Sequence, residues 1–143
     1  MSQVRSLSRA FFLSVLYMVV KGPGGITLNK NSLQSLVNSR KLYVNLDEFL
    51  KNRNSRYNYG VWNDSGKLVG FALMKPNKNS KSLSLELIVT QKGGGYGKQL
   101  MNAIKTLSKN ITLVSVPAAR QFYMNQGFVP NGKYGFVYRF KNV

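Results

Sequence analysis

A glycine-rich run in the second half of the chain governs the interpretation of the fold: Lys92-Gly93-Gly94-Gly95-Tyr96-Gly97-Lys98. The apolar residues 83–89 before it predict a strand. After it, apolar residues at helical spacing predict a helix whose inner face carries Leu100, Met101, Ile104 and Leu107. Glycines bring bare backbone N–H groups close to a ligand, and a helix N-terminus adds unpaired donors. The order strand, glycine loop, helix therefore predicts a phosphate-binding turn, although three successive glycines also suit a flexible connector.

Two common phosphate loops do not fit this run. The ATPase loop G-x-x-x-x-G-K-[ST] would need glycine at Lys92 and Ser or Thr at Gln99. The dinucleotide loop G-x-G-x-x-G would need its third glycine at Lys98, and no acidic residue follows Glu86 to hold a ribose. An ATPase and a dinucleotide-dependent enzyme are therefore both disfavoured.

The residues on either side of the run mix strands with helices. Upstream, residues 57–62 alternate at period two, Asn63-Asp64-Ser65-Gly66 signals a turn, and residues 67–74 form the return strand. Two short helices are expected before this hairpin, near 32–41 and 46–52. In the second of them, Asn45 is a candidate cap, Glu48 stands at the capping-box position, and Asp47 suits the positive end.

Downstream of the loop the alternation continues. Residues 111–116 predict a strand, and Pro117 opens a helix that stops at Gly127. Aromatic residues at every second position, Tyr134 to Phe140, predict a final strand. The fold class is therefore α/β (α+β), with a central mixed sheet of about six to seven strands flanked by helices. The length of 143 residues suits one domain.

A second block lies downstream of the glycine run: Ala119-Arg120-Gln121-Phe122-Tyr123-Met124-Asn125-Gln126-Gly127-Phe128. Together the two blocks resemble the GNAT superfamily of acetyl-coenzyme A-dependent N-acetyltransferases, whose signatures read [QR]-x-x-G-x-[GA] and A-x-x-F-Y-x-x-x-G-F. Lys92 replaces the Gln or Arg of the first, and Val116 replaces an Asn often found before the second. The resemblance implies a single domain over residues 1–143, in which residues 1–56 are divergent and residues 57–140 bind the cofactor.

The resemblance also implies roles for individual residues. Backbone amides of Gly93 to Lys98 would hold the pyrophosphate of acetyl-coenzyme A, and the side chains of Lys92 and Lys98 would add positive charge. The implied cofactor-binding residues of the loop are Lys92, Gly93, Gly94, Gly95, Tyr96, Gly97 and Lys98. The strand edge near Ile88 and Val89 would pair with the pantetheine arm. Tyr123 would be the general acid that protonates the leaving thiolate, unless it is a core tyrosine beside Phe122.

Glu86 is the carboxylate left over for a general base. The chain has no His and no Cys, and its other carboxylates, Asp47, Glu48 and Asp64, have predicted structural roles. Glu86 lies on the strand before the loop, where alternation would turn it away from Leu85 and Leu87. Two alternatives stay open: an ion pair with a nearby Lys, or a water chain that removes the proton instead.

Composition excludes several classes of protein. Without Cys or His the chain has no disulfide, no thiolate or imidazole zinc site and no Ser-His dyad, and with only four carboxylates we expect no metal site. Its 21 Lys and Arg residues give a formal net charge of +17. This charge predicts attraction to an acidic partner, such as nucleic acid, anionic lipid or a phosphorylated ligand, although codon bias in an AT-rich genome also enriches Lys.

The apolar segment 10–20 lies between Arg9 and Lys21. It is shorter than the roughly 20 residues that span a bilayer, and no signal-peptidase site follows it. We therefore expect a buried strand or helix, no membrane span and an intracellular (cytoplasmic) location.

Two functional hypotheses remain. The first is an N-acetyltransferase that moves an acetyl group from acetyl-coenzyme A to an unidentified amine, with non-specific nucleic acid contact through its basic surface. The second is a catalytically inactive, strongly basic nucleic-acid-binding protein on the same fold. Basic clusters lie at 51–56 and 75–81, the first of them beside aromatic residues, and such clusters suit nucleic acid. They also suit a solvated charged face that lies over core aromatic residues.

Overall fold

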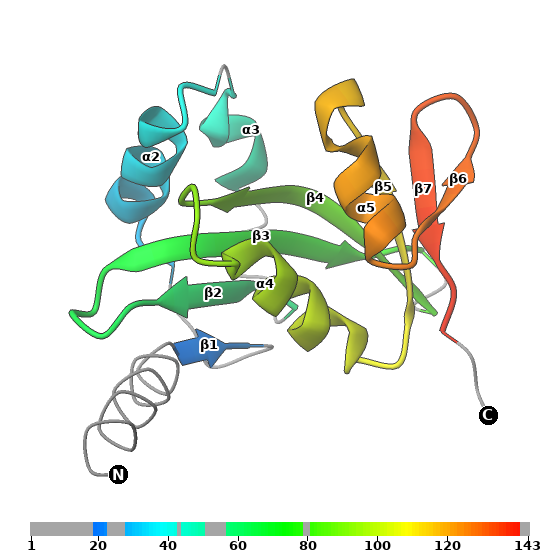
Figure 1. The fold of residues 1–143 in the computed structure, drawn as a ribbon, viewed down its shortest axis with the longest axis horizontal. Coiled ribbons are helices and arrows are strands. Elements are labelled where there is room, and N and C mark those ends of the chain that lie inside the picture. Colours follow the sequence, from blue (N-terminus) through cyan, green and yellow to red (C-terminus); the bar gives the residue numbers. More distant parts are fainter. Residues whose placement is uncertain (1–18, 23–27, 43, 51–56, 79–80, 141–143) are drawn as a thin grey trace, which may run out of the picture.

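The computed structural model describes residues 19–22, 28–42, 44–50, 57–78 and 81–140 (Figure 1). Its strands are β1 (Val19–Lys21), β2 (Tyr59–Trp62), β3 (Leu68–Pro76), β4 (Ser82–Thr90), β5 (Asn110–Val114), β6 (Val129–Asn131) and β7 (Gly135–Tyr138). They form a seven-stranded sheet in the order β1-β2-β3-β4-β5-β7-β6. All neighbours are antiparallel except β4 and β5, which are parallel. The predicted mixed sheet is confirmed.

Helices cover both faces of this sheet, as Figure 1 shows. They are α2 (Lys30–Ser39), α3 (Leu46–Leu50), α4 (Tyr96–Lys105) and α5 (Arg120–Asn125), with a 3-10 turn η1 (Pro117–Ala119) before α5. Both α4 and α5 pack on one face, and α2 and α3 pack on the other. The predicted helices are confirmed, except that the segment opened by Pro117 begins as a 3-10 turn.

Strand β3 explains why the sheet needs helices on both sides. Val69, Ala72 and Met74 belong to the core on the α4 face. Leu68, Phe71 and Leu73 belong to the core on the α2 face. A strand buried on both faces has a continuous apolar run instead of an alternating one.

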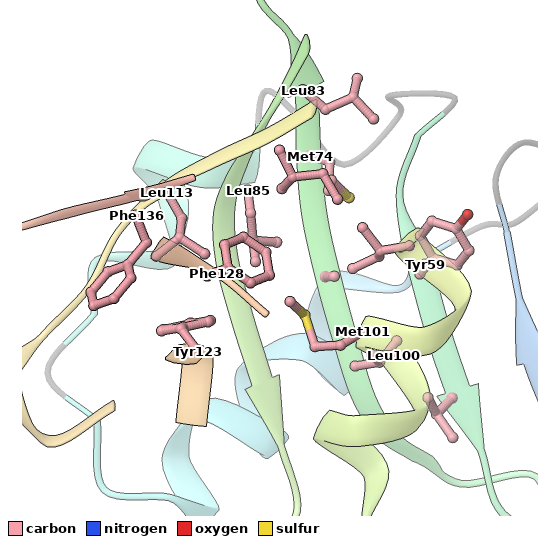
Figure 2. Packing of buried hydrophobic residues seen from close by; sticks show 14 of the residues in the cluster. Tyr59, Met74, Leu83, Leu85, Leu100, Met101, Leu113, Tyr123, Phe128 and Phe136 are labelled. Carbon is pink, nitrogen blue, oxygen red and sulfur yellow. The ribbon is translucent and has the colours of Figure 1, made fainter. Parts of the chain in front are cut away.

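Aromatic rings fill the core beneath α5, as the close view in Figure 2 shows. The ring centroid of Tyr123 lies 5.3 Å from that of Phe122, 5.8 Å from Phe128 and 6.1 Å from Phe136. Pairs in this range add about 0.5–1.5 kcal/mol each beyond the area they bury. This packing holds α5 against β7, which carries Phe136.

Local hydrogen bonds account for the predicted turn and cap. The Asn63 side chain accepts hydrogen bonds from the Ser65 and Lys67 amides at 3.1 and 2.9 Å, which closes the hairpin turn that contains Asp64. At the start of α3, the Asp47 amide donates to Asn45 Oδ1 at 3.2 Å. The Asn45 side-chain amide in turn donates to Glu48 Oε1 at 3.5 Å.

Strand β4 contains a bulge at Glu86. Leu73 pairs with Leu87 and Met74 pairs with Leu85, so Glu86 has no partner on β3. The extra residue moves Leu85 to the α4 face and Leu87 to the α2 face. The expectation that Glu86 faces away from both leucines was therefore wrong, because Leu85 and Leu87 do not share a face.

Strands β4 and β5 separate after a short parallel contact. Their pairing runs only from Ser82↔Asn110 to Ser84↔Thr112. Beyond Ser84, β4 continues to Thr90 without a strand on its β5 side. The sheet therefore opens between its two halves at the carboxyl end of β4.

Some sequence expectations differ from the structure or fall outside it. The strand expected over 111–116 ends at Val114, and the strand β6 was not expected. Of the apolar segment 10–20, only Val19 and Val20 are described, and they belong to β1. The basic cluster 51–56 lies outside the described residues. None of the helices in the described ranges is long and apolar enough to cross a membrane.

Candidate functional site

The glycine loop connects the free end of β4 to α4. Gly93, Gly94 and Gly95 all have left-handed backbones, with φ of 82°, 76° and 69°. Residues with a side chain rarely adopt three such angles in succession. The glycines are therefore required by the conformation of the loop.

This conformation leaves a row of backbone donors without partners. Across the described chain, no backbone acceptor receives a hydrogen bond from the amides of residues 93–98. Gly95 is the N-cap of α4 and offers no side-chain cap. Unpaired amides and the positive end of the helix dipole both favour an anion.

A groove runs from this loop into the opening between β4 and β5. It has a volume of about 380 Å³ and contacts Ile88, Val89 and Thr90 on one side and η1 with Phe122 and Tyr123 on the other. The neighbouring hollow at the loop has about 300 Å³. The two share Arg40, Thr90, Gly97 and Phe122, so they are continuous.

Tyr123 lines the groove from α5. Its side chain is 7% exposed, and burial raises the pKa of its phenol above the ordinary value. No hydrogen bond to its hydroxyl is found among the described residues, where every fully buried side-chain polar atom has a partner. The hydroxyl therefore keeps some contact with solvent, and it stays protonated at neutral pH.

Three cations surround the hollow at the loop: Arg40, Lys92 and Lys98. Gly97 lies against α5, because an added Cβ would meet the Phe122 ring at 3.2 Å. The sequence indicated the two lysines but not Arg40. Arg40 stands far from the loop in the chain, and only the fold brings it there.

Glu86 lies in a different place. It lines a hollow of about 340 Å³ between β4 and β5, with Ser84, Thr112 and Asn131, and this hollow shares no lining residue with the groove of Tyr123. Lys75 Nζ approaches Glu86 Oε1 at 2.8 Å. Ser84 Oγ donates to Glu86 Oε2 at 3.1 Å. The ion pair considered from the sequence is therefore present.

The structure thus gathers most of the predicted residues at one groove: Ile88, Val89, Tyr123 and the residues 92–98 other than Gly94 line its two connected parts. The Gly94 backbone lies between them in the same turn. Glu86 is not in this set. In the described part of the chain, no cluster of His, Cys, Asp and Glu is suited to a metal ion.

Comparisons with known proteins place the chain in a family. The family model "Acetyltransferase (GNAT) domain" matches residues 28–137. A search of curated proteins found no significant match.

Solved structures share the fold at low sequence identity. A putative GNAT-family acetyltransferase from Desulfovibrio desulfuricans aligns with a TM-score of 0.65 and 13% identity, over 87% of this chain and 99% of its own. N-acetylglutamate synthase from Neisseria gonorrhoeae, complexed with coenzyme A and N-acetyl-glutamate, aligns with a TM-score of 0.67 and 11% identity, over 88% of this chain and 36% of its own. Nourseothricin acetyltransferase aligns with a TM-score of 0.52 and 17% identity, over 59% of this chain and 65% of its own.

The chain therefore spans about a third of the synthase and just under two thirds of the nourseothricin enzyme. Because the family model covers more than half of the 143 residues, the chain belongs to the GNAT family of acetyltransferases.

Proposed function

We propose that this protein is an acetyl-coenzyme A-dependent N-acetyltransferase that acts inside the cell on an amine. The observation that carries the proposal is the row of free amides at residues 93–98, at the mouth of a groove that Tyr123 lines. The loop suits the pyrophosphate, because it offers donors and positive charge without a carboxylate. The unpaired edge of β4 suits an extended pantetheine arm, because its backbone groups lack a strand partner.

The reaction needs a proton donor and a proton acceptor. The neutral amine nitrogen attacks the thioester carbonyl carbon, a C–N bond forms and the C–S bond breaks. Tyr123 gives its proton to the leaving sulfur, a role that requires a group still protonated when the bond breaks. Burial in the aromatic core keeps this phenol protonated, since it raises its pKa.

Glu86 is proposed as the base that removes a proton from the amine. It lies on the bulge of β4, at the opening between β4 and β5 but outside the groove of Tyr123. A general base must reach the amine directly or through one water, so this role requires an acceptor that extends across the opening between β4 and β5. Glu86→Gln should lower turnover about 10²-fold. It should change the free energy of unfolding by less than about 1 kcal/mol, since a partly exposed ion pair contributes little. Turnover within a factor of two of wild type would leave only the ion pair as its role.

Titration calorimetry with acetyl-coenzyme A tests the binding step. Gly95→Glu should abolish binding by placing a carboxylate in the anion hollow. An added Cβ at Gly95 has nothing within 4 Å, so the structural cost is that of a side chain on a left-handed backbone with φ of 69°, roughly 1–2 kcal/mol. Gly66→Glu is the matched control: φ at Gly66 is 81° and its Cβ position is equally open. This control carries the same charge change and backbone cost in a remote turn and should bind normally. If wild-type protein does not bind, the enzymatic proposal is wrong.

Turnover can be followed directly through the thiol of released coenzyme A. The chain contains no Cys, so a thiol reagent has no background from the protein. A panel of amines, including small molecules, peptides and nucleic-acid-bound peptides, would identify the acceptor class.

A second candidate function is nucleic acid binding without catalysis. The observation that favours it is the charge of +17, of which residues 91–143 contribute eight Lys and Arg and no Asp or Glu. A coenzyme site uses only a few of these cations. An acceptor associated with nucleic acid would reconcile the two candidates, because a cationic surface repels free basic amines and attracts polyanions.

A further inference from the structure

Helix α2 ends in a turn that directs the chain toward the groove. The Lys41 amide donates to the Asn38 carbonyl at 3.0 Å, and the Leu42 amide donates to the Val37 carbonyl at 3.4 Å. These two bonds define a Schellman motif, in which the residue after the cap adopts a left-handed backbone. Arg40 is the cap of α2, and the motif fixes the position from which its side chain leaves the helix.

The left-handed position of this motif is occupied by a lysine. Lys41 has φ of 55°, where glycine would be the usual residue. For a residue with a side chain this conformation costs roughly 1–2 kcal/mol. The turn is therefore held in place by the packing of α2, and its neighbour Arg40 is held with it.

Arg40 lines both the groove of Tyr123 and the hollow at the glycine loop. It faces the loop from the α2 side, whereas Lys92 and Lys98 belong to the loop and to α4. The ion pairs found among the described residues join Lys30 to Asp47 and Lys75 to Glu86. Neither uses Arg40, and neither hollow includes a carboxylate among its lining residues.

We propose that the Arg40 guanidinium binds a phosphate group of the donor substrate from the wall opposite the glycine loop. This inference rests on the proposed function, and it deepens that function by adding a residue to the donor site. The hollow that Arg40 shares with Lys92, Lys98 and the free amides of the loop collects donors and positive charge only. A guanidinium fits two phosphate oxygens at once, which a lysine ammonium does not.

The test compares coenzyme A binding to wild type, Arg40→Gln, Arg40→Lys and Lys41→Gln by calorimetry. Lys41→Gln is the matched control: it removes the same charge one residue away, at a side chain that lines neither hollow. Arg40→Gln should raise Kd about 10- to 100-fold, Arg40→Lys should be intermediate, and Lys41→Gln should change Kd less than about threefold. Thermal unfolding should be alike for Arg40→Gln and wild type, since the Arg40 side chain is exposed.

Two further measurements separate phosphate binding from a structural role. Between about 50 and 300 mM NaCl, Arg40→Gln should weaken the salt dependence of Kd, because one charged contact is lost, and Lys41→Gln should not. Dephospho-coenzyme A identifies the phosphate: an equal loss for both ligands assigns Arg40 to the pyrophosphate, and a loss for coenzyme A alone assigns it to the 3′-phosphate.

The inference is overturned if Arg40→Gln weakens binding no more than Lys41→Gln, or if it weakens binding with an unchanged salt dependence. Failure of wild-type protein to bind coenzyme A would instead remove the proposed function, and the donor site with it. The two failures are therefore distinguishable.

Discussion

Tyr123 has two roles to reconcile, because its ring is part of the core and its hydroxyl is proposed to act on the substrate. The ring contacts Phe122, Phe128 and Phe136, while the residue also lines the groove. The same burial that stabilises the core raises the pKa of the phenol. The burial of Tyr123 therefore accounts both for its packing in the core and for the raised pKa of its phenol.

Tyr123→Phe tests the catalytic role with little structural change. Turnover should fall roughly 10²-fold while the Kd for acetyl-coenzyme A stays nearly constant, since only the proton donor is lost. Because the pKa of Tyr123 lies above its ordinary value of 10.0, the phenol should lose its proton, and wild-type turnover should fall, only at a pH above about 10. Equal turnover in the two proteins would reduce Tyr123 to a core residue.

The left-handed residues Lys41 and Ser108, with φ of 55° and 57°, give a test of backbone strain. Lys41→Gly and Ser108→Gly should each raise the free energy of unfolding by about 0.5–1 kcal/mol, because glycine adopts this conformation without a Cβ clash. Denaturant unfolding measures the effect. Ser35→Gly, exposed in the middle of α2, is the control and should lower stability by a similar amount. A loss of stability in both left-handed variants would contradict the strain argument.

At the scale of elements, strand β3 extends beyond its pairing with β2 and uses a side chain as the next partner on that edge. The pairing with β2 ends at Tyr59↔Ala72, and the Met74 amide donates to Asn58 Oδ1 at 2.9 Å. Asn58 is completely buried just before β2. Its amide oxygen thus supplies an acceptor that no strand provides at this point.

Asn58→Ala should therefore lower the free energy of unfolding by about 2 kcal/mol or more, because it leaves a buried N–H without an acceptor. Asn63→Ala removes an acceptor in the exposed hairpin turn. There water replaces the lost bonds, so the loss should stay below about 1 kcal/mol. The fluorescence of the single Trp, Trp62, can follow urea unfolding of both variants. A smaller loss for Asn58→Ala than for Asn63→Ala would refute this account.

Elements with local signals could be predicted from the sequence, and elements set by distant contacts could not. Alternation and turn residues predict the hairpin over 57–74, and the run of glycines predicts the loop 92–98. The bulge at Glu86 depends on the register with β3, which no local pattern records. Strand β6 is short and contains Pro130, so its residues resemble a loop. Arg40 was missed because only the fold brings α2 beside the glycine loop.

For the whole molecule, the dominant feature is the excess of positive charge over the few carboxylates. The described carboxylates that form ion pairs, Asp47 and Glu86, engage Lys30 and Lys75. Most of the 21 cations therefore cannot be neutralised by the 4 acidic residues of the chain. Such a surface attracts polyanions over a distance set by the salt concentration.

We expect binding to DNA or RNA without strong sequence preference. Log K should fall with log salt at a slope near −3 to −6, which corresponds to about four to seven phosphate contacts on a duplex. Replacing Arg53, Arg56, Lys78 and Lys81 with Gln should reduce the slope and leave acetyl-coenzyme A binding intact. A flat salt response would mean that the charge serves solubility or reflects composition, and a small molecule or protein amine would become the favoured acceptor.

The separation of β4 from β5 has a consequence for cooperativity. Three residue pairs join the two halves of the sheet along this seam, so the backbone bonds that hold β5, β7 and β6 to the rest are few. A donor arm lying in the opening would act as a missing strand and would couple the two halves. Amide hydrogen exchange should then slow on both sides of the seam when coenzyme A binds, at Ile88 and Val89 and also in β5. The ligand would complete the fold as well as the site.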